Sequence, residues 1–471
     1  MPEQLETPLT HRVIESPLGR LLHSRVFERL KISSVDREFG VLRARAAADV
    51  AGEDVDAFLD ELGVTDPIDD SLRRKIETTL QHHSTVKSEY ESVADRWDEV
   101  FWGDTESTLD ERTRLEKRRR EYGSRWVSPQ KEFKFITKAD IVDIVDFDIP
   151  SPQSAIERWR GYDGSDVYGP PESMPDVAVS RTMRGPETRE YLVRFESPSA
   201  FFDDTAYARV YEPADSSQDD ELPTIIFATG LAMACDLMEY WTEEEYVGRD
   251  LAPQGYRVVL PIPPWHGRRE IPGYYTGEPY LARMPSSGVE LYEGQAKEIA
   301  VLVQWLRSQG APTVGVGGLS LGGIVTSFVA AYADTWPSEM QPDFAIPVAA
   351  SAKIADLLFE SSLTKSLGVT GALEAAGWTR DEMSHLDSVL TAPTTPGLDP
   401  DRIYPVGGLV DEMTQYPTMR QTLDEWGVPA ENRLEWDCGH FGVTLRAMRT
   451  DTFQEFLIDA LETHSEDGPV Q

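Results

Sequence analysis

The stretch Gly318-Leu319-Ser320-Leu321-Gly322 decides the fold that this chain is expected to adopt. The apolar run from Val314 to Gly317 directly before it predicts a buried strand, and the run from Ile324 to Ala331 after it predicts a helix. A serine at a sharp strand-to-helix turn, with glycine two residues to either side, forms a nucleophile elbow. Glycine is needed there because neighbouring backbone leaves no room for Cβ atoms. The turn lifts the Ser320 hydroxyl above the sheet, where the helix N-terminus stabilises negative charge.

Strand and helix patterns alternate on both sides of this turn. Extended segments are expected at 188–196, 205–211, 224–229, 256–262, 313–318, 344–350, 402–407 and 433–437. Helical patterns are expected at 237–251, 289–309, 321–334, 413–426 and 444–462. This alternation predicts an α/β fold with a mostly parallel sheet and helices on both faces.

The N-terminal part of the chain has a different pattern. Residues 1–150 are charged and predict a mainly helical region, with helices at 14–30, 54–62, 71–83, 92–100 and 112–120. We expect residues 151–187 to be a linker, and 188–464 to form the domain that carries Ser320. The basic run Lys117–Arg120 is either a solvated helix face or a binding site for phosphate, nucleic acid or an acidic partner. The apolar stripe at 14–30 either packs on the sheet domain or lies on a membrane surface.

A serine hydroxyl is a weak nucleophile and needs a base, which in turn needs a third group to orient it. After an elbow of this kind the partners follow in the order serine, acid, histidine. His440 follows the last expected strand, and Asp411 follows the strand before it. Both therefore lie at the carboxyl ends of strands, where open α/β sheets bind ligands. Glu412 is the alternative acid; Asp411 is favoured.

Over residues 188–464 the chain resembles the α/β-hydrolase superfamily. The resemblance rests on three motifs: Gly318-Leu319-Ser320-Leu321-Gly322, Gly408-Leu409-Val410-Asp411 and Gly439-His440-Phe441-Gly442. It implies that Ser320 is the nucleophile, His440 the general base and Asp411 its partner. It also implies an enzyme without a cofactor or a catalytic metal.

The resemblance further implies an oxyanion hole made of two backbone N–H groups. One is that of Leu321, the residue after the nucleophile. The second donor is expected after the third core strand, at Leu231. This chain has Thr229-Gly230 where the family usually has His-Gly.

The loop from Pro263 to Arg269 is similar to that of the branch of α/β-hydrolase-domain-containing protein 18. Six residues are expected to contact the substrate. Gly230 follows the third core strand, and the others lie in this loop and the segment 268–288: Trp265, His266, Arg268, Tyr274 and Tyr275. For His266 the alternative is a structural role, and for Arg268 the alternative is salt bridges within an acid-rich protein.

Residues 352–398 separate the sixth and seventh core strands and are expected to form a lid. Five apolar residues in this insertion either face an acyl chain or pack helices together: Leu357, Leu358, Phe359, Leu363 and Leu367.

The composition excludes several classes of protein. Two cysteines, Cys235 and Cys438, lie far apart and provide neither a disulfide framework nor metal-ligand spacing. No stretch approaches the roughly 18 apolar residues of a membrane span, and the N-terminus lacks the layout of a secretion signal. A cytoplasmic location without stable membrane insertion is therefore expected.

The net charge of −37 is the most unusual property of the composition, and ten of the 45 basic residues are lysines. Such a charge opposes compaction in dilute buffer, while molar salt screens it within a few ångströms. The pattern resembles that of proteins from salt-accumulating halophiles; the alternative is an acidic protein from an ordinary environment. It also argues against nucleic acid as the main partner.

Together these features favour a serine hydrolase that cleaves a small-molecule ester, a thioester or a lipid ester through an acyl-enzyme. Hydrolysis of an amide or a C–C bond on the same scaffold is an alternative, and so is a non-catalytic scaffold that binds a partner. The cavity above Ser320 discriminates between substrates: an apolar cavity indicates lipid, and a charged one a small acid or sugar ester. The sequence leaves open whether the chain forms a homo-oligomer.

The charge leads to a first prediction. Because salt screens self-repulsion, we expect the midpoint of thermal unfolding to rise steadily from low to molar salt. Melts followed by circular dichroism over a KCl series measure this directly. A midpoint that does not depend on salt would contradict the halophile interpretation.

Overall fold

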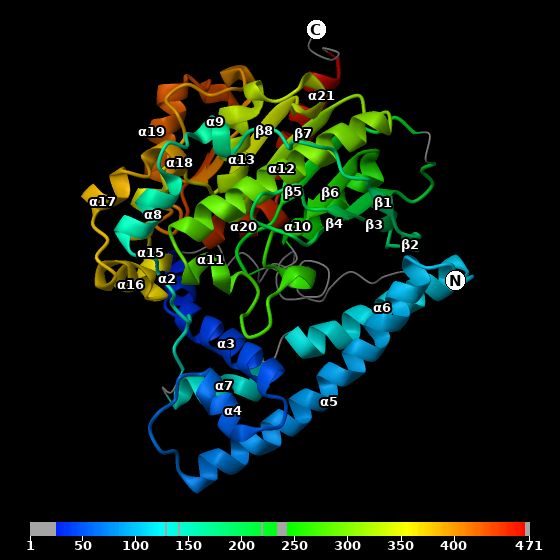
Figure 1. Ribbon diagram of the computed structural model, residues 1–471. Helices are drawn as coiled ribbons and strands as arrows, with labels where there is room; N and C mark the ends of the chain where they lie inside the picture. The colour runs from blue at the N-terminus through cyan, green and yellow to red at the C-terminus, as the bar shows by residue number, and fades with distance from the viewer. Residues whose placement is uncertain (1–24, 128–129, 140–141, 218–219, 233–242, 467–471) are drawn as a thin grey trace.

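The computed structural model describes residues 25–127, 130–139, 142–217, 220–232 and 243–466. A sheet domain and an N-terminal helical region make up the molecule (Figure 1). Residues 14–24 and 237–242, the first parts of two expected helices, lie outside the described residues.

One ten-stranded sheet forms the centre of the protein, with the strand order β1-β3-β4-β6-β5-β7-β8-β9-β10 and β2 beside β3. Its antiparallel part is β1 (Ala178–Val179), β2 (Met183–Arg184), β3 (Thr188–Glu196) and β4 (Thr205–Pro213), and β4 also pairs antiparallel with β6. Its parallel part is β6 (Arg257–Pro261), β5 (Thr224–Ala228), β7 (Val314–Leu319), β8 (Phe344–Val348), β9 (Val406–Gly408) and β10 (Leu434–Trp436). A mostly parallel sheet with an elbow after its central strand β7 is the α/β-hydrolase fold, which confirms the predicted fold class.

Helices cover both faces of this sheet, which is why its central strands are apolar throughout. Every residue of β5, β6, β7 and β8 is buried. Side chains alternate between the faces: Ile226 and Val316 join one apolar cluster, and Ile225 and Phe227 join the other. The first cluster lies under α12 (Ser286–Ser308) and α13 (Leu321–Tyr332), and the second under α10 (Glu243–Leu251), α20 (His440–Arg449) and α21 (Asp451–Glu466).

Helices between β8 and β9 stand where the lid was expected. They are α14 (Ile354–Glu360), α15 (Ser362–Ser366), α16 (Val369–Ala375), α17 (Arg380–Ser384) and α18 (Asp387–Leu390). Other helices of this domain are α11 (Glu278–Ala282) and α19 (Tyr416–Trp426). The segment 151–187, expected to be a linker, contains α8 (Pro152–Trp159), α9 (Gly164–Val167) and the sheet strands β1 and β2.

Two expected elements of the sheet domain differ from the structure. The helix expected at 444–462 is two helices, α20 and α21, because the β-branched Thr450 between them is extended, with φ −115° and ψ 137°. The strand expected at 402–407 is shorter, since β9 begins only at Val406. Pro405 before it has no N–H to donate to a neighbouring strand.

The N-terminal region is mainly helical, as expected. Its helices are α2 (Arg25–Ile32), α3 (Val35–Ala51), α4 (Val55–Glu61), α5 (Asp70–Phe101), α6 (Leu109–Val127) and α7 (Gln130–Lys138). Helices α5 and α6 lie side by side as an arm that reaches away from the sheet (Figure 1).

Two helices of this region correct the sequence prediction. The segments 71–83 and 92–100 belong to the single helix α5, because residues 84–91 contain no glycine or proline that would end it. Helix α3 was not predicted. It buries small residues such as Ala44 and Ala47, which favour helix but give no pattern of large apolar side chains.

Four buried charged side chains join the arm to the sheet. On α6, Arg119 Nε lies 2.8 Å from Glu116 Oε2. Arg209 of β4 pairs with Glu116 at 2.9 Å and also with Glu190 of β3. Burial acts to raise the pKa of Glu116, but the two arginines outweigh it and lower the pKa to about 2. In the basic run Lys117–Arg120, Arg119 is therefore an internal ion-pair partner, not part of a solvated or phosphate-binding face.

The elbow has the strained backbone that its sequence predicts. Ser320 has φ 57° and ψ −112°, between the end of β7 and the start of α13. The Gly322 N–H donates to the Thr229 carbonyl at 3.0 Å, which joins the elbow to the loop after β5. A Cβ at Gly322 would lie 2.3 Å from the Ala228 carbonyl oxygen, so only glycine fits.

This contact predicts the effect of two matched substitutions. In Gly322→Ala the new methyl group meets backbone that cannot move aside, so we expect a loss of about 3 kcal/mol in the free energy of unfolding. Gly371 of α16 has nothing within 4 Å of an added Cβ, so Gly371→Ala is neutral or stabilising. Urea unfolding of both variants measures the difference. Equal stabilities would show that the elbow tolerates a side chain.

Candidate active site

The structure brings Asp411 and His440 together. Asp411 lies in the loop after β9 and His440 is the first residue of α20, and His440 Nδ1 is 2.8 Å from Asp411 Oδ2. The carboxylate also accepts the N–H groups of Met413 at 2.8 Å and Thr414 at 3.0 Å, and the Thr414 hydroxyl at 2.8 Å. Both partners are buried, whereas the alternative acid Glu412 is exposed.

These contacts hold Asp411 in its charged form. Burial acts to raise the pKa of Asp411, but the charge of His440 and the hydrogen bonds from His440 and Thr414 outweigh it and lower the pKa. For His440, burial acts to lower the pKa, but Asp411 and, more weakly, Glu28 outweigh it and raise the pKa. With Nδ1–H donated to Asp411, Nε2 is the nitrogen that can accept a proton.

Ser320 and the Asp411 loop border the same cavity, because both Ser320 and Thr414 line it. Among the described residues, no hydrogen bond joins the Ser320 hydroxyl to His440. Contacts between a nucleophile and its base are often long without substrate and tighten when substrate binds.

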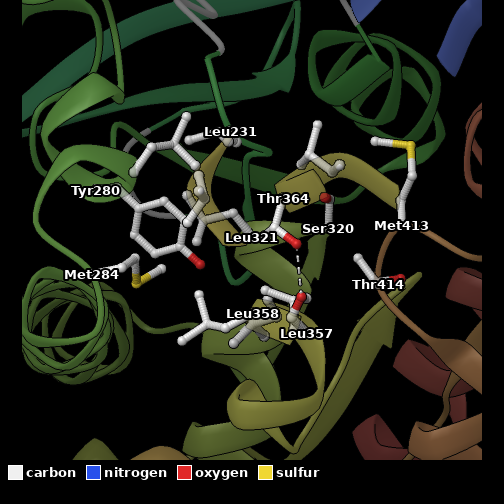
Figure 2. Close-up of a pocket in the computed structure, with 14 residues that line it drawn as sticks. Leu231, Tyr280, Met284, Ser320, Leu321, Leu357, Leu358, Thr364, Met413 and Thr414 are labelled. Atoms are coloured by element: carbon white, nitrogen blue, oxygen red, sulfur yellow. Dashed lines mark hydrogen bonds between the residues drawn. The ribbon is translucent and has the colours of Figure 1, made fainter. Parts of the chain in front are cut away.

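Leu321 and Leu231, whose backbone N–H groups were expected to stabilise an oxyanion, both line the cavity with Ser320. Leu321 is the first residue of α13, so its N–H has no acceptor within the helix and faces the elbow. Leu231 lines the cavity together with Ser320 and Leu321 (Figure 2).

The cavity is apolar and narrow, with a volume of about 30 Å³. No charged side chain is among its lining residues. They come from the elbow and α13, the loop after β5, the segment at α11, the helices between β8 and β9, and the Asp411 loop (Figure 2). The lining consists of Leu231, Tyr280, Leu281, Met284, Ser320, Leu321, Ile324, Leu357, Leu358, Leu363, Thr364, Val369, Met413 and Thr414.

Three of the five lid residues named from the sequence line this cavity: Leu357, Leu358 and Leu363. Phe359 and Leu367 do not line it and pack within the lid and core. Sequence reasoning did not single out Met284 or Met413. The only sequence signal for Met284 was its position within the segment 268–288, and that for Met413 was its position two residues after Asp411.

His266 supports the loop after β5 and does not line the cavity. Its Nδ1 donates to the Pro264 carbonyl at 2.8 Å, and its Nε2 accepts the Ala232 N–H at 3.2 Å. Burial lowers the pKa of His266 to about 4, and the charge of Arg269 adds to this, so the ring is neutral. His266 thus has the contacts of its structural alternative and is not among the residues that line the cavity.

Arg268 and Trp265 are also outside the cavity. The Arg268 guanidinium lies 4.7 Å from the ring centroid of Trp97 and 3.4 Å from the Asp98 carboxylate, both on α5. Trp265 packs edge-on against Phe202, with ring centroids 5.0 Å apart. Arg268 thus forms a salt bridge with Asp98, which was the alternative stated for it.

The remaining expected contacts lie outside the cavity as well. Tyr275 is fully buried and packs edge-on against Phe39 of α3, and Tyr274 packs half-buried against the main core. Gly230 is buried at the end of β5. The segment 268–288 was expected over the cleft. Tyr280, Leu281 and Met284 of this segment line the cavity, whereas Tyr275 and Arg268 pack against the N-terminal helices, whose position the sequence pattern did not reveal.

Glu28 is the residue near this site that sequence reasoning missed. It lies on α2, and its carboxylate contacts the backbone of Phe441 and Gly442 directly after His440. No motif surrounds Glu28 in the sequence, so there was no signal by which to find it.

The described residues hold no group of three or more histidine, cysteine or acidic side chains arranged for a metal ion. Within the same residues, no helix has both the length and the apolar character needed to cross a bilayer.

No family model and no curated protein matches the sequence. Solved structures that are similar in fold include an acetyl xylan esterase from Paenibacillus sp. R4, with 14% identity, 65% of this chain and 93% of that chain covered, and a TM-score of 0.43. An S-formylglutathione hydrolase from Agrobacterium tumefaciens has 14% identity, with 61% and 98% covered and a TM-score of 0.37. For a Pyrococcus horikoshii acylaminoacyl peptidase the identity is 14%, the coverage 62% and 52%, and the TM-score 0.38. Likeness this distant identifies no substrate, and the fold rests on the strand order itself.

Proposed function

We propose that this protein is a serine hydrolase that cleaves carboxylic esters with an apolar acyl group. The observation that carries the proposal is the hydrogen-bonded Asp411–His440 pair beside an apolar cavity lined by Ser320.

In the first step the Ser320 Oγ attacks the carbonyl carbon of the ester while His440 Nε2 takes the hydroxyl proton. Negative charge develops on the carbonyl oxygen, and we assign its stabilisation to the N–H groups of Leu321 and Leu231. The imidazolium formed is stabilised by Asp411. When the C–O bond breaks, His440 returns the proton to the leaving alkoxide, so an alcohol departs and the acyl group stays on Ser320.

In the second step water attacks the acyl-enzyme, and His440 takes one of its protons. The second tetrahedral intermediate collapses, the bond to Ser320 Oγ breaks, and the proton passes from His440 to that oxygen. A carboxylic acid leaves and the free serine is restored.

The cavity favours an apolar acyl group because none of its lining side chains is charged. A carboxylate or sugar placed there would lose its hydration without a compensating partner. An alkyl chain, in contrast, gains about 0.8 kcal/mol for each buried methylene.

The nucleophile is tested by labelling. We expect a fluorophosphonate probe to modify the wild-type protein in molar salt and to leave Ser320→Ala unmodified, because only an activated serine reacts with it. Mass spectrometry of the labelled peptide locates the adduct. Well-folded wild-type protein that takes up no label would favour the non-catalytic scaffold.

Asp411→Asn should fold normally and lose on the order of 10⁴ in kcat, because His440 would take the wrong tautomer.

The cavity is tested with p-nitrophenyl esters of increasing acyl length. We expect kcat/KM to rise about fourfold per methylene until the cavity is full, from the free energy of burying each group. Leu363→Trp, which fills the cavity from α15, should shift the optimum to shorter chains.

Phe359→Trp is the matched control, since Phe359 belongs to the neighbouring helix α14 and does not line the cavity. It should keep the wild-type preference. A wild-type protein that turns over acetyl esters alone would rule out an apolar acyl pocket.

A further inference from the structure

Glu28 reaches the candidate histidine from the opposite end of the sequence. Helix α2 packs against α20, which begins with His440, and against the lid helix α15 (Figure 1). Glu28 Oε1 accepts the N–H of Phe441 at 3.2 Å, and its Oε2 accepts the N–H of Gly442 at 3.1 Å. These N–H groups belong to the first turn of α20 and have no acceptor within that helix.

The motif around His440 is shaped to admit this carboxylate. A Cβ on Gly439 would lie 2.5 Å from the carboxyl carbon of Glu28, so any larger residue would push the carboxylate away. Glycine fits before His440 because it leaves space for the Glu28 side chain of α2 to reach the N–H groups of Phe441 and Gly442.

We propose that Glu28 is a positioning residue of the active site, which holds the first turn of α20 and so fixes His440 against Asp411 and above Ser320. This inference rests on the proposed function. It assigns the N-terminal helical region a part in catalysis, because α2 supplies a side chain that the sheet domain lacks.

The charge of Glu28 adds to this role. Elements packed against α20 include α2, α10, α21 and β9, and among the described residues two charged groups act on the His440 imidazole, Asp411 and Glu28. Farther out, Lys31 Nζ of α2 lies 5.8 Å from the ring centroid of Phe441. Asp437 and Arg446 act on Cys438, two residues before His440: burial raises the pKa of Cys438, Arg446 acts to lower it and Asp437 to raise it. A second carboxylate near His440 favours the imidazolium that forms as Ser320 attacks.

Two variants separate position from charge. Glu28→Gln keeps the length of the side chain and one acceptor oxygen but removes the charge, whereas Glu28→Ala removes both acceptors. Glu77→Gln removes the same charge from an exposed site on α5 and is the control. The measurements are kcat/KM against pH with a p-nitrophenyl ester, thermal melts, and the titration of His440 followed by NMR.

The sign of the pH effect follows from the chemistry. Only neutral His440 accepts the serine proton, so kcat/KM falls as the pH drops through its pKa. Removing the Glu28 charge lowers that pKa, so in Glu28→Gln the acid limb moves to lower pH while most of the plateau is kept. In Glu28→Ala the plateau falls about tenfold or more, because hydrogen bonds to a charged group are lost. Glu77→Gln behaves as wild type.

The outcomes distinguish this inference from the proposed function. A wild-type protein that neither takes up the fluorophosphonate nor turns over esters defeats the proposed function. The NMR titration still reports whether Glu28 acts on His440. Active wild-type protein whose Glu28 variants keep its acid limb, its plateau and its His440 titration would overturn the role of Glu28. A lowered melting midpoint with an unmoved acid limb and titration would overturn it too, since it would indicate a purely structural contact.

Discussion

The structure depends on a close backbone contact between the elbow and β5. Gly322 donates its N–H to Thr229 across a gap with no room for a Cβ. This single contact sets the height of Ser320 above the sheet and presents Leu321 at the start of α13. It also draws the loop that carries Leu231 alongside. Ser320 and Leu321 are thus placed by the packing of main chain on main chain.

Much of the sheet domain could be predicted, because its signals are local or periodic. Buried parallel strands are short apolar runs, and the elbow is a glycine-serine-glycine pattern with a strand before it and a helix after it. The Asp411–His440 contact followed from chain order and from the rule that strand ends meet at one edge. Each of these inferences needed only neighbouring residues or the topology of the sheet.

What could not be predicted depends on packing between distant segments. Tyr275 and Arg268 belong to a loop whose residue types are typical of a cleft lining. In the structure, however, Tyr275 packs against Phe39 of α3 and Arg268 packs against Trp97 of α5. His266 was read as a cleft residue, although its two nitrogens are used by backbone groups. No sequence pattern distinguishes Glu28 from other acidic residues. Its contact with the backbone of α20 is visible only once α2 is packed against that helix. Such contacts leave no period or spacing in the chain.

The buried ion pairs between the arm and the sheet have a consequence for how the molecule unfolds. Detaching α6 would break the pair between Arg209 and Glu116 and expose the remaining Arg209–Glu190 pair to water, so the buried network is complete only while arm and sheet stay together. Loss of the arm would therefore remove buried hydrogen bonds and packing from the strands β3 and β4 beneath it. Although the arm reaches far into solvent, helix and sheet are bound into one cooperative unit and should melt in a single transition.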